Sequence, residues 1–116
     1  MKKIHLIVAV VFSALLLSAH SAGAAYAWYY GKITRVWRTR GRVVLTLDTD
    51  ALDDCKYKYA YFIGPVMNDK EIEASYLMAL SAFYTRQEVG LVIDKDNKIG
   101  GQCYADSIDI FTPGHR

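Results

Sequence analysis

The chain has 116 residues, of which 53% are hydrophobic and 22% are charged, and its formal net charge is +2 at neutral pH. Both excess positive charges are lysines within residues 1–24, so the remaining residues carry no net charge. A neutral domain lacks the positive field on which non-specific nucleic-acid binding depends. Nucleic acid is therefore not an expected partner, and the length suffices for one domain.

The first 24 residues have the pattern of a secretory signal peptide. Two lysines precede an apolar run at 4–17, and the small residues at 22–24 match the pattern that signal peptidase accepts. The apolar run is shorter than the roughly 20 residues of a membrane-spanning helix. We therefore expect a signal peptide at 1–24 and a single exported domain at 25–116, periplasmic or secreted and without a membrane span. An uncleaved anchor, or cleavage after a second small-residue pattern at 25–27, are the alternatives.

Two cysteines, Cys55 and Cys103, predict a disulfide, because an even count is typical of exported proteins. In the chain-entropy model, closing a loop of about 49 residues stabilises the fold by about 4 kcal/mol. A metal site or a cysteine nucleophile would need neighbouring ligands or a base. His115 is the only histidine after residue 24, so neither a metal nor a cofactor is expected.

Three strands are predicted before the helix. Aromatic and β-branched residues at 28–36 indicate the first strand, and a polar, glycine-containing turn at 38–42 leads to a second strand at 43–47. The acidic segment 48–54 has no periodicity and indicates a loop. Tyrosines then alternate with other residues over 55–63, which predicts the third strand.

One helix and two further strands follow. Asn68 and Glu71 have the spacing of a capping box, and the helix is expected to end near Arg86. Strands are predicted at 89–93 and, after a charged turn, at 102–111. One stripe along the helix is expected to pack over the open end of the barrel and so to close it. Its residues are Ile72, Tyr76, Ala79, Leu80 and Phe83.

The resulting order, three strands, one helix and two strands, is that of the OB-fold, a five-stranded barrel. The fold class predicted is therefore mainly β with one helix, an OB-fold-like barrel. A general antiparallel sheet with one covering helix is the alternative. In the barrel, Cys55 at the start of the third strand would meet Cys103 at the start of the fifth.

Few residues offer catalytic chemistry. The loop at 48–54 resembles a calcium-binding loop in composition, but it lacks the glycine and the final glutamate of that motif. Elsewhere in the domain, Ser75, Ser81 and Ser107 have no histidine to activate them, since His115 is next to the chain end. We expect a binding protein and not an enzyme.

The first hairpin and the third strand carry the predicted ligand-binding residues. Arginines alternate in the hairpin, so their guanidinium groups are expected to project together beside an aromatic ring. Arginine next to aromatic rings suits anionic sugars, and OB-folds bind oligosaccharides or oligonucleotides on this side of the barrel. A charged, solvated edge and a half-buried barrel wall are the structural alternatives. The predicted residues are Trp37, Arg38, Arg40, Arg42, Tyr57 and Tyr59.

The helix carries a second predicted surface. Between residues 74 and 85 it has no charged side chain, although one stripe alone can face its own barrel. An uncharged outer stripe predicts a packing partner, of which a second copy of the chain is the simplest. Coverage by another part of the same chain is the alternative. The predicted interface residues are Ala74, Leu77, Met78, Ser81 and Thr85.

In layout the chain resembles the B subunits of bacterial AB5 toxins of the subtilase-cytotoxin and pertussis-like type. The shared features are a signal peptide, one disulfide, the OB-like strand order, and a helix followed after a short break by the strand at 87–93. The resemblance implies a ring-forming, glycan-binding protein with a separate catalytic subunit. No sugar-contacting residue is carried over from that family.

Two functions follow as expectations. The first is an exported, oligomeric carbohydrate-binding protein that is similar to a toxin B subunit. The second is a periplasmic accessory protein that binds a protein or peptide partner through the helix. Export and the zero net charge place nucleic-acid binding well behind both.

Overall fold

The computed structural model describes residues 26–112, so the predicted signal peptide lies outside the described residues. It confirms a mainly β fold with one α-helix after the third strand, within the described part of the chain. The elements are β1 (Tyr26–Thr39), β2 (Arg42–Leu47), β3 (Ala60–Phe62), α2 (Asp69–Thr85), β4 (Glu88–Asp94) and β5 (Cys103–Phe111). Short 3₁₀ turns occupy Asp50–Leu52, Lys56–Lys58 and Lys95–Asn97.

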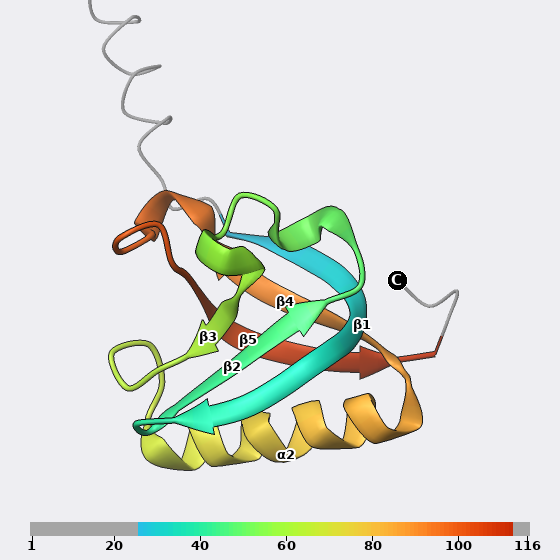
Figure 1. Cartoon of the computed structure of the whole chain (residues 1–116). Coiled ribbons are helices and arrows are strands. Elements are labelled where there is room, and N and C mark those ends of the chain that lie inside the picture. Colours follow the sequence, from blue (N-terminus) through green and yellow to red (C-terminus); the bar gives the residue numbers. More distant parts are fainter. Residues whose placement is uncertain (1–25, 113–116) are drawn as a thin grey trace, which may run out of the picture.

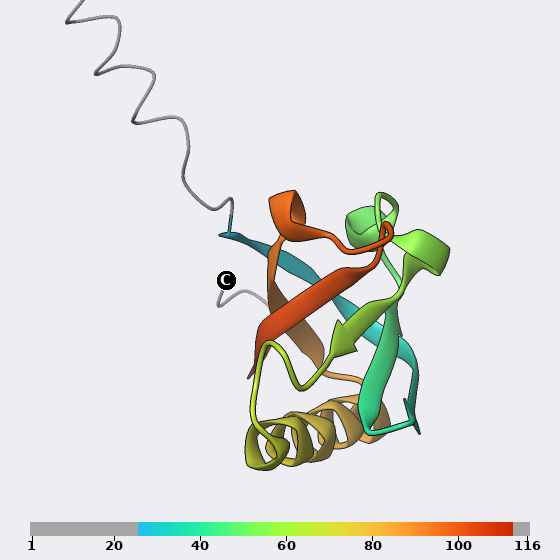
Figure 2. The same cartoon turned by 90° about the vertical axis from the view of Figure 1, so that its left-hand side faces the viewer.

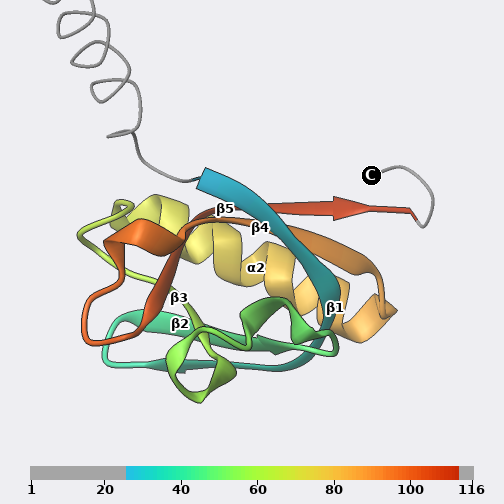
Figure 3. The same cartoon turned by 90° about the horizontal axis from the view of Figure 1, so that it is seen from above.

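The five strands are hydrogen-bonded in the order β1-β2-β3-β5-β4, and β4 returns to β1, so the sheet closes into a barrel. The long strand β1 makes this possible because it bends between two partners (Figure 3). Its first half pairs with β4 and its second half with β2. All these pairings are antiparallel except β3 with β5, which run parallel over a short stretch.

The helix and the turns lie at opposite ends of the barrel. In Figure 1, α2 runs along one end, where it packs against β1, β2 and β5. The three 3₁₀ turns gather at the other end, as Figure 2 also shows. Inward side chains from all five strands and α2 form the main core, and the largest of them is the fully buried Phe62. Within the described residues, no helix is long and apolar enough to cross a membrane.

The hairpin between β1 and β2 is tighter than the predicted turn at 38–42. Thr39 already pairs with Arg42, and the two residues between them both have positive φ, 50° for Arg40 and 75° for Gly41. Two central residues of this kind form the turn whose twist matches that of antiparallel strands. The strands therefore continue into the predicted loop.

The third strand is much shorter than predicted. Only Ala60–Phe62 forms β3, and Lys56–Lys58 instead forms a turn in which Tyr57 has φ 59° and Lys58 has φ 60°. The amide of Lys56 donates a hydrogen bond to the carbonyl of Gly101, which draws this segment toward the start of β5 and away from β2. The prediction of a strand over 55–63 from the alternating tyrosines was therefore wrong in its length, since β3 covers only Ala60–Phe62.

The helix begins as predicted. The Asn68 side chain accepts a hydrogen bond from the Glu71 amide, the Glu71 side chain accepts one from the Asn68 amide, and Arg86 ends the helix in a left-handed conformation. Of the predicted stripe, Ile72 and Ala79 are fully buried. Three other members are only half-buried, whereas two small residues outside the stripe are buried. The half-buried residues are Tyr76, Leu80 and Phe83, and the additional buried residues are Ser75 and Ala82.

The predicted disulfide is present. Cys55 and Cys103 are bonded, their Cα atoms are 5.4 Å apart, and both side chains are buried. The bond joins the turn before β3 to the first residue of β5 across 48 residues of sequence. It therefore fastens two segments whose strands pair over only two residues.

Candidate functional site

The outer face of the barrel carries a row of aromatic side chains, which we call the outer aromatic surface. Across β1, β2, β3 and β5 the register aligns Trp37 with Val44, Val44 with Tyr61, and Tyr61 with Tyr104. Residues paired in this way share one face of a sheet. Because Val43 and Phe62 point into the core, this neighbouring set points outward. The outer aromatic surface consists of Trp37, Tyr57, Tyr59, Tyr61 and Tyr104.

The rings of this surface form one continuous chain of contacts. The Tyr59 ring centroid lies 5.0 Å from that of Trp37, 5.5 Å from that of Tyr57 and 6.1 Å from that of Tyr61. Tyr61 in turn lies 6.0 Å from Tyr104. These spacings are those of favourable aromatic pairs, so the rings support one another.

Exposure varies along the surface. Tyr61 is buried together with Val44 and Ile63, and these side chains form a floor beneath the half-buried Trp37 and Tyr59. Tyr57, by contrast, is 67% exposed and stands at the end of the row. Tyr57 lies in the turn at Lys56–Lys58 and has a left-handed backbone conformation. This conformation costs about 1 kcal/mol or more for a non-glycine residue, and such strained residues are common at functional sites.

Cationic side chains lie over these rings. The Arg35 guanidinium is 4.1 Å from the Trp37 ring centroid, and that of Arg42 is 5.5 Å from the Tyr61 centroid. The ammonium of Lys56 is 5.3 Å from the ring of Tyr57. Each contact holds a positive charge above an aromatic face. The surface thus combines flat apolar rings with cations along its length.

Hydroxyl and amide groups complete the surface near β5. The Tyr104 hydroxyl donates to the side-chain oxygen of Gln102 at 3.0 Å, and the Gln102 amide nitrogen donates to the Tyr61 hydroxyl at 3.4 Å. Burial raises the pKa of the Tyr61 hydroxyl above its ordinary value, and the charge of Arg42 partly offsets this effect. Tyr61 therefore stays a neutral hydrogen-bonding group at physiological pH.

The three hairpin arginines do not project together. In the tight hairpin Arg42 pairs with Thr39 and Arg38 with Val43, so Arg38 and Arg42 lie on opposite faces of the sheet. Arg38 turns toward α2, where its guanidinium donates to Glu73 at 2.6 Å and lies 5.4 Å from the Tyr76 ring centroid. Arg40 occupies the exposed turn itself. With a two-residue turn, each even-numbered residue of β1 pairs with an odd-numbered residue of β2. Arg38 and Arg42 are both even-numbered, so they lie on opposite faces, and the alternation seen in the sequence does not continue across the hairpin.

The aromatic members of the predicted site do come together. Trp37, Tyr57 and Tyr59 are all part of the outer aromatic surface, even though Tyr57 is not on a strand. Tyr61 continues the same alternation on β3. Tyr104 was missed because only the parallel pairing of β3 with β5 brings it beside Tyr61, and nothing local to residue 104 predicts that pairing.

The predicted outer stripe of α2 is exposed along its whole length. Leu77 is 58% exposed and Met78 37%, and the small residues on either side are also exposed. Tyr84, which sequence reasoning did not single out, extends the stripe and is 78% exposed. The exposed members of the predicted stripe are Ala74, Leu77, Met78, Ser81 and Thr85.

The acidic loop makes contacts within the protein. Asp48 accepts a hydrogen bond from the Lys32 amide at 2.7 Å, Asp53 lies 3.6 Å from the Lys58 ammonium, and Asp54 lies 3.5 Å from that of Lys95. In the part of the chain that the structure describes, no three metal-ligating side chains gather into a site.

No protein-family model matches the chain, and no curated protein and no solved structure matches it.

Proposed function

We propose that this protein is an exported, non-enzymatic glycan-binding protein that holds an anionic sugar on its outer aromatic surface. The observation that carries the proposal is the continuous row of rings with Arg35, Arg42 and Lys56 above them. Aromatic faces take the apolar side of a sugar ring, and guanidinium groups bind carboxylates or other anions through charge-assisted hydrogen bonds.

We assign the barrel to the OB-fold. Strand order, the position of α2 across one end, and the parallel β3–β5 pair support this assignment. OB-folds bind oligosaccharides or oligonucleotides on the face of the second and third strands. In this chain β2 and β3 contribute the floor of the outer aromatic surface, with Val44 and Tyr61 at its centre.

Export is supported by the signal-like start of the sequence and by the buried disulfide. Disulfides persist in oxidising compartments and are rare in the cytosol. A neutral domain in such a compartment meets glycans and other proteins, whereas it seldom meets nucleic acid. The ligand class therefore follows from the surface and from the compartment together.

Neutralising Arg35 or Arg42 is expected to weaken binding of an anionic glycan about tenfold or more, because each change removes a charge-assisted hydrogen bond of about 1.5–3 kcal/mol. The measurement is a panel of carboxylated, sulfated and neutral glycans, followed by calorimetry with Arg35→Gln and Arg42→Gln. Trp37→Ala is expected to weaken anionic and neutral sugars alike, since it removes a stacking face.

Arg38→Gln is the matched control, because its guanidinium faces Glu73 and Tyr76 of α2 instead of the outer aromatic surface. It is expected to leave glycan affinity within twofold. Equal losses for Arg38→Gln and Arg42→Gln would argue against the proposed site. A correctly folded protein that binds no glycan in the panel would end the proposal.

The exposed stripe of α2 supports a second element of the proposal, a homo-oligomer. Leu77 and Met78 are large apolar side chains at the middle of a stripe without charge, and identical subunits can bury such a stripe against one another. A toxin-B-like ring with a separate catalytic subunit is the form that the resemblance implies. A different protein bound to the same stripe is the alternative function.

Introducing a charge into this stripe is expected to dissociate the oligomer. Met78→Glu places an acid where a partner would bury a thioether, and burial of an unpaired charge costs several kcal/mol. Light scattering at micromolar concentration measures the change against Ala27→Glu, an equal charge at an exposed position on β1. If the unchanged protein is already a monomer, the homo-oligomer is excluded and the stripe is left for a different protein.

A further inference from the structure

A groove of about 420 Å³ opens on the outer face between two loops, the one from β3 to α2 and the one from β4 to β5. This volume is within the range of sites that hold small molecules or a few peptide residues. Ile63, Pro65 and Val66 line it from the first loop, and Ile99 lines it from the second. Tyr104 borders both this groove and the outer aromatic surface, so the two are neighbours with different linings.

The walls of the groove are apolar and open to solvent. Ile99 is 64% exposed and Val66 is 40% exposed, and the two lie at one groove and not singly on the surface. They belong to different loops, and both project into the same groove. An apolar side chain of a ligand would find contacts on two sides here.

The charged groups among the lining residues are carboxylates. Asp106 is the extra residue of a β-bulge, because Ser107 pairs with Val92 while Ala105 pairs with Ile93. Bulges commonly re-aim a side chain, and this one brings the exposed Asp106 to the groove. Asp94 is buried at the groove and also accepts hydrogen bonds from the Asp96 amide and the Asn97 side chain.

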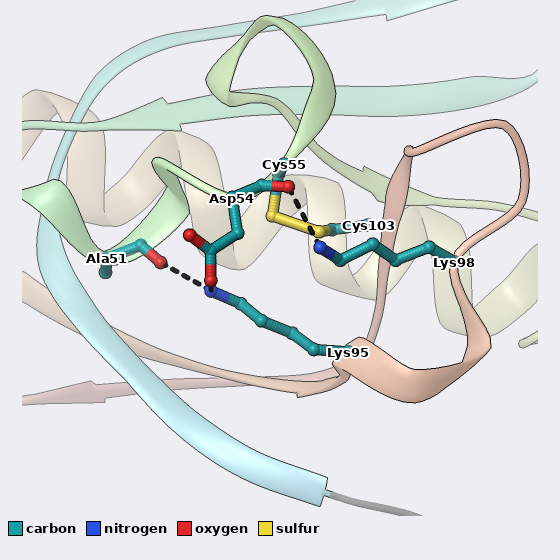
Figure 4. Close-up of a disulfide and its surroundings, with 6 residues drawn as sticks. All are labelled: Ala51, Asp54, Cys55, Lys95, Lys98 and Cys103. Atoms are coloured by element: carbon teal, nitrogen blue, oxygen red, sulfur yellow. Dashed lines mark hydrogen bonds and ion pairs between the residues drawn. A yellow bond between two sulfur atoms is a disulfide. The ribbon is translucent and has the colours of Figure 1, made fainter.

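The two lysines between β4 and β5, Lys95 and Lys98, do not line the groove. The Lys95 ammonium donates to the carbonyl of Ala51 at 2.9 Å, and that of Lys98 donates to the carbonyl of Asp54 at 2.9 Å. Figure 4 shows both side chains extending toward the segment that precedes Cys55. The second loop therefore contributes the amide of Asn97 and the apolar Ile99 to the groove but no positive charge.

We propose that this groove binds a peptide segment of another protein that carries an apolar side chain next to lysine or arginine. The apolar walls at Val66 and Ile99 take the apolar side chain, and the exposed carboxylate of Asp106 takes the basic one, with the buried Asp94 adding negative charge nearby. The charge complementarity selects a basic segment, whereas the outer aromatic surface, with its arginines, selects anions. This binding site adjoins the proposed glycan site at Tyr104, but none of its other lining residues belongs to the outer aromatic surface.

The test uses the full exported chain and two labelled hexapeptides, one alternating leucine with lysine and one alternating leucine with glutamate. Fluorescence anisotropy is expected to show saturable binding of the lysine peptide alone, weakened by added salt. Asp106→Asn is expected to weaken this binding about fivefold or more, because it removes one partner of a partly desolvated charge pair. Ile99→Ser is expected to weaken it through lost apolar contact.

Asp109→Asn is the matched control, since it removes an equal charge from an exposed position three residues further along β5 and outside the groove. It is expected to change the affinity less than twofold. Equal binding of the two peptides, or equal effects of Asp106→Asn and Asp109→Asn, would overturn the proposal. So would a change of oligomeric state in Ile99→Ser without any peptide, which would identify a second copy of the chain as the occupant.

Discussion

Replacing Cys55 and Cys103 together by serine is expected to lower the free energy of unfolding by about 4 kcal/mol. The disulfide links two residues that are 48 positions apart in the sequence. Without it, the unfolded chain has more conformational freedom, which favours the unfolded state. Small domains have about 5–15 kcal/mol of stability in total, so the variant is expected to be partly unfolded near 37 °C. Thermal unfolding should shift down by about 16 °C or more.

The loss is expected to affect ligand binding as well as stability. Cys55 is next to the turn at Lys56–Lys58, whose amide at Lys56 bonds the carbonyl of Gly101 near Cys103. Without the covalent link, the left-handed conformation of Tyr57 has less support. At a temperature where the variant is folded, glycan affinity should fall, because the exposed end of the aromatic surface is no longer fixed in advance.

The control for this prediction is the unchanged protein treated with a reducing agent. It is expected to unfold at the same lowered denaturant concentration as the double variant, since both have the same open chain. Single variants are unsuitable because they leave one reactive thiol. An unfolding midpoint unchanged by both treatments would contradict the role assigned to the bond.

Phe62→Ala is expected to lower the free energy of unfolding by about 3–5 kcal/mol. Phe62 is fully buried on β3, where its side chain belongs to the main core that all five strands and α2 form. Removing it forfeits the burial of a large apolar side chain and leaves a cavity that a closed sheet cannot readily collapse. Because β3 has only three residues, few backbone hydrogen bonds remain to hold it in place.

Chemical denaturation measures this change, with Tyr84→Ala as the control. Tyr84 is an aromatic residue of similar size on the outer side of α2, and its exposure predicts a change within about 0.5 kcal/mol. A loss for Tyr84→Ala as large as that for Phe62→Ala would mean that α2 is covered by a partner under the conditions of the measurement.

The candidate site was partly predictable from sequence. Alternation predicts that Tyr57, Tyr59 and Tyr61 share one face, but which face is outward, and that Trp37 joins them, follows only from the strand pairing. Arg38 follows the same alternation up to the hairpin, but its direction relative to Arg42 depends on how many residues the turn contains. The turn length is a property of the backbone at Arg40 and Gly41, and composition alone does not fix it.

The groove was not predictable at all. Val66 and Ile99 are separated by more than thirty residues of sequence and are brought together because two loops flank β5. Asp106 faces the groove because of a bulge, and the lysines near it are drawn aside by carbonyl groups of a distant loop. Each of these features depends on pairing between segments far apart in the chain.

The sequence by itself determined the order of the elements, the capped start of α2, the pairing of Cys55 with Cys103 and the uncharged outer stripe of the helix. These depend on local hydrogen bonding, on periodicity and on the cysteine count, all of which are properties of neighbouring residues or of composition. The tertiary structure alone decided the length of β3, the opposite directions of Arg38 and Arg42, and the meeting of Tyr61 with Tyr104. Those outcomes arise from strand register and barrel closure, in which the free energy of distant contacts outweighs local preference.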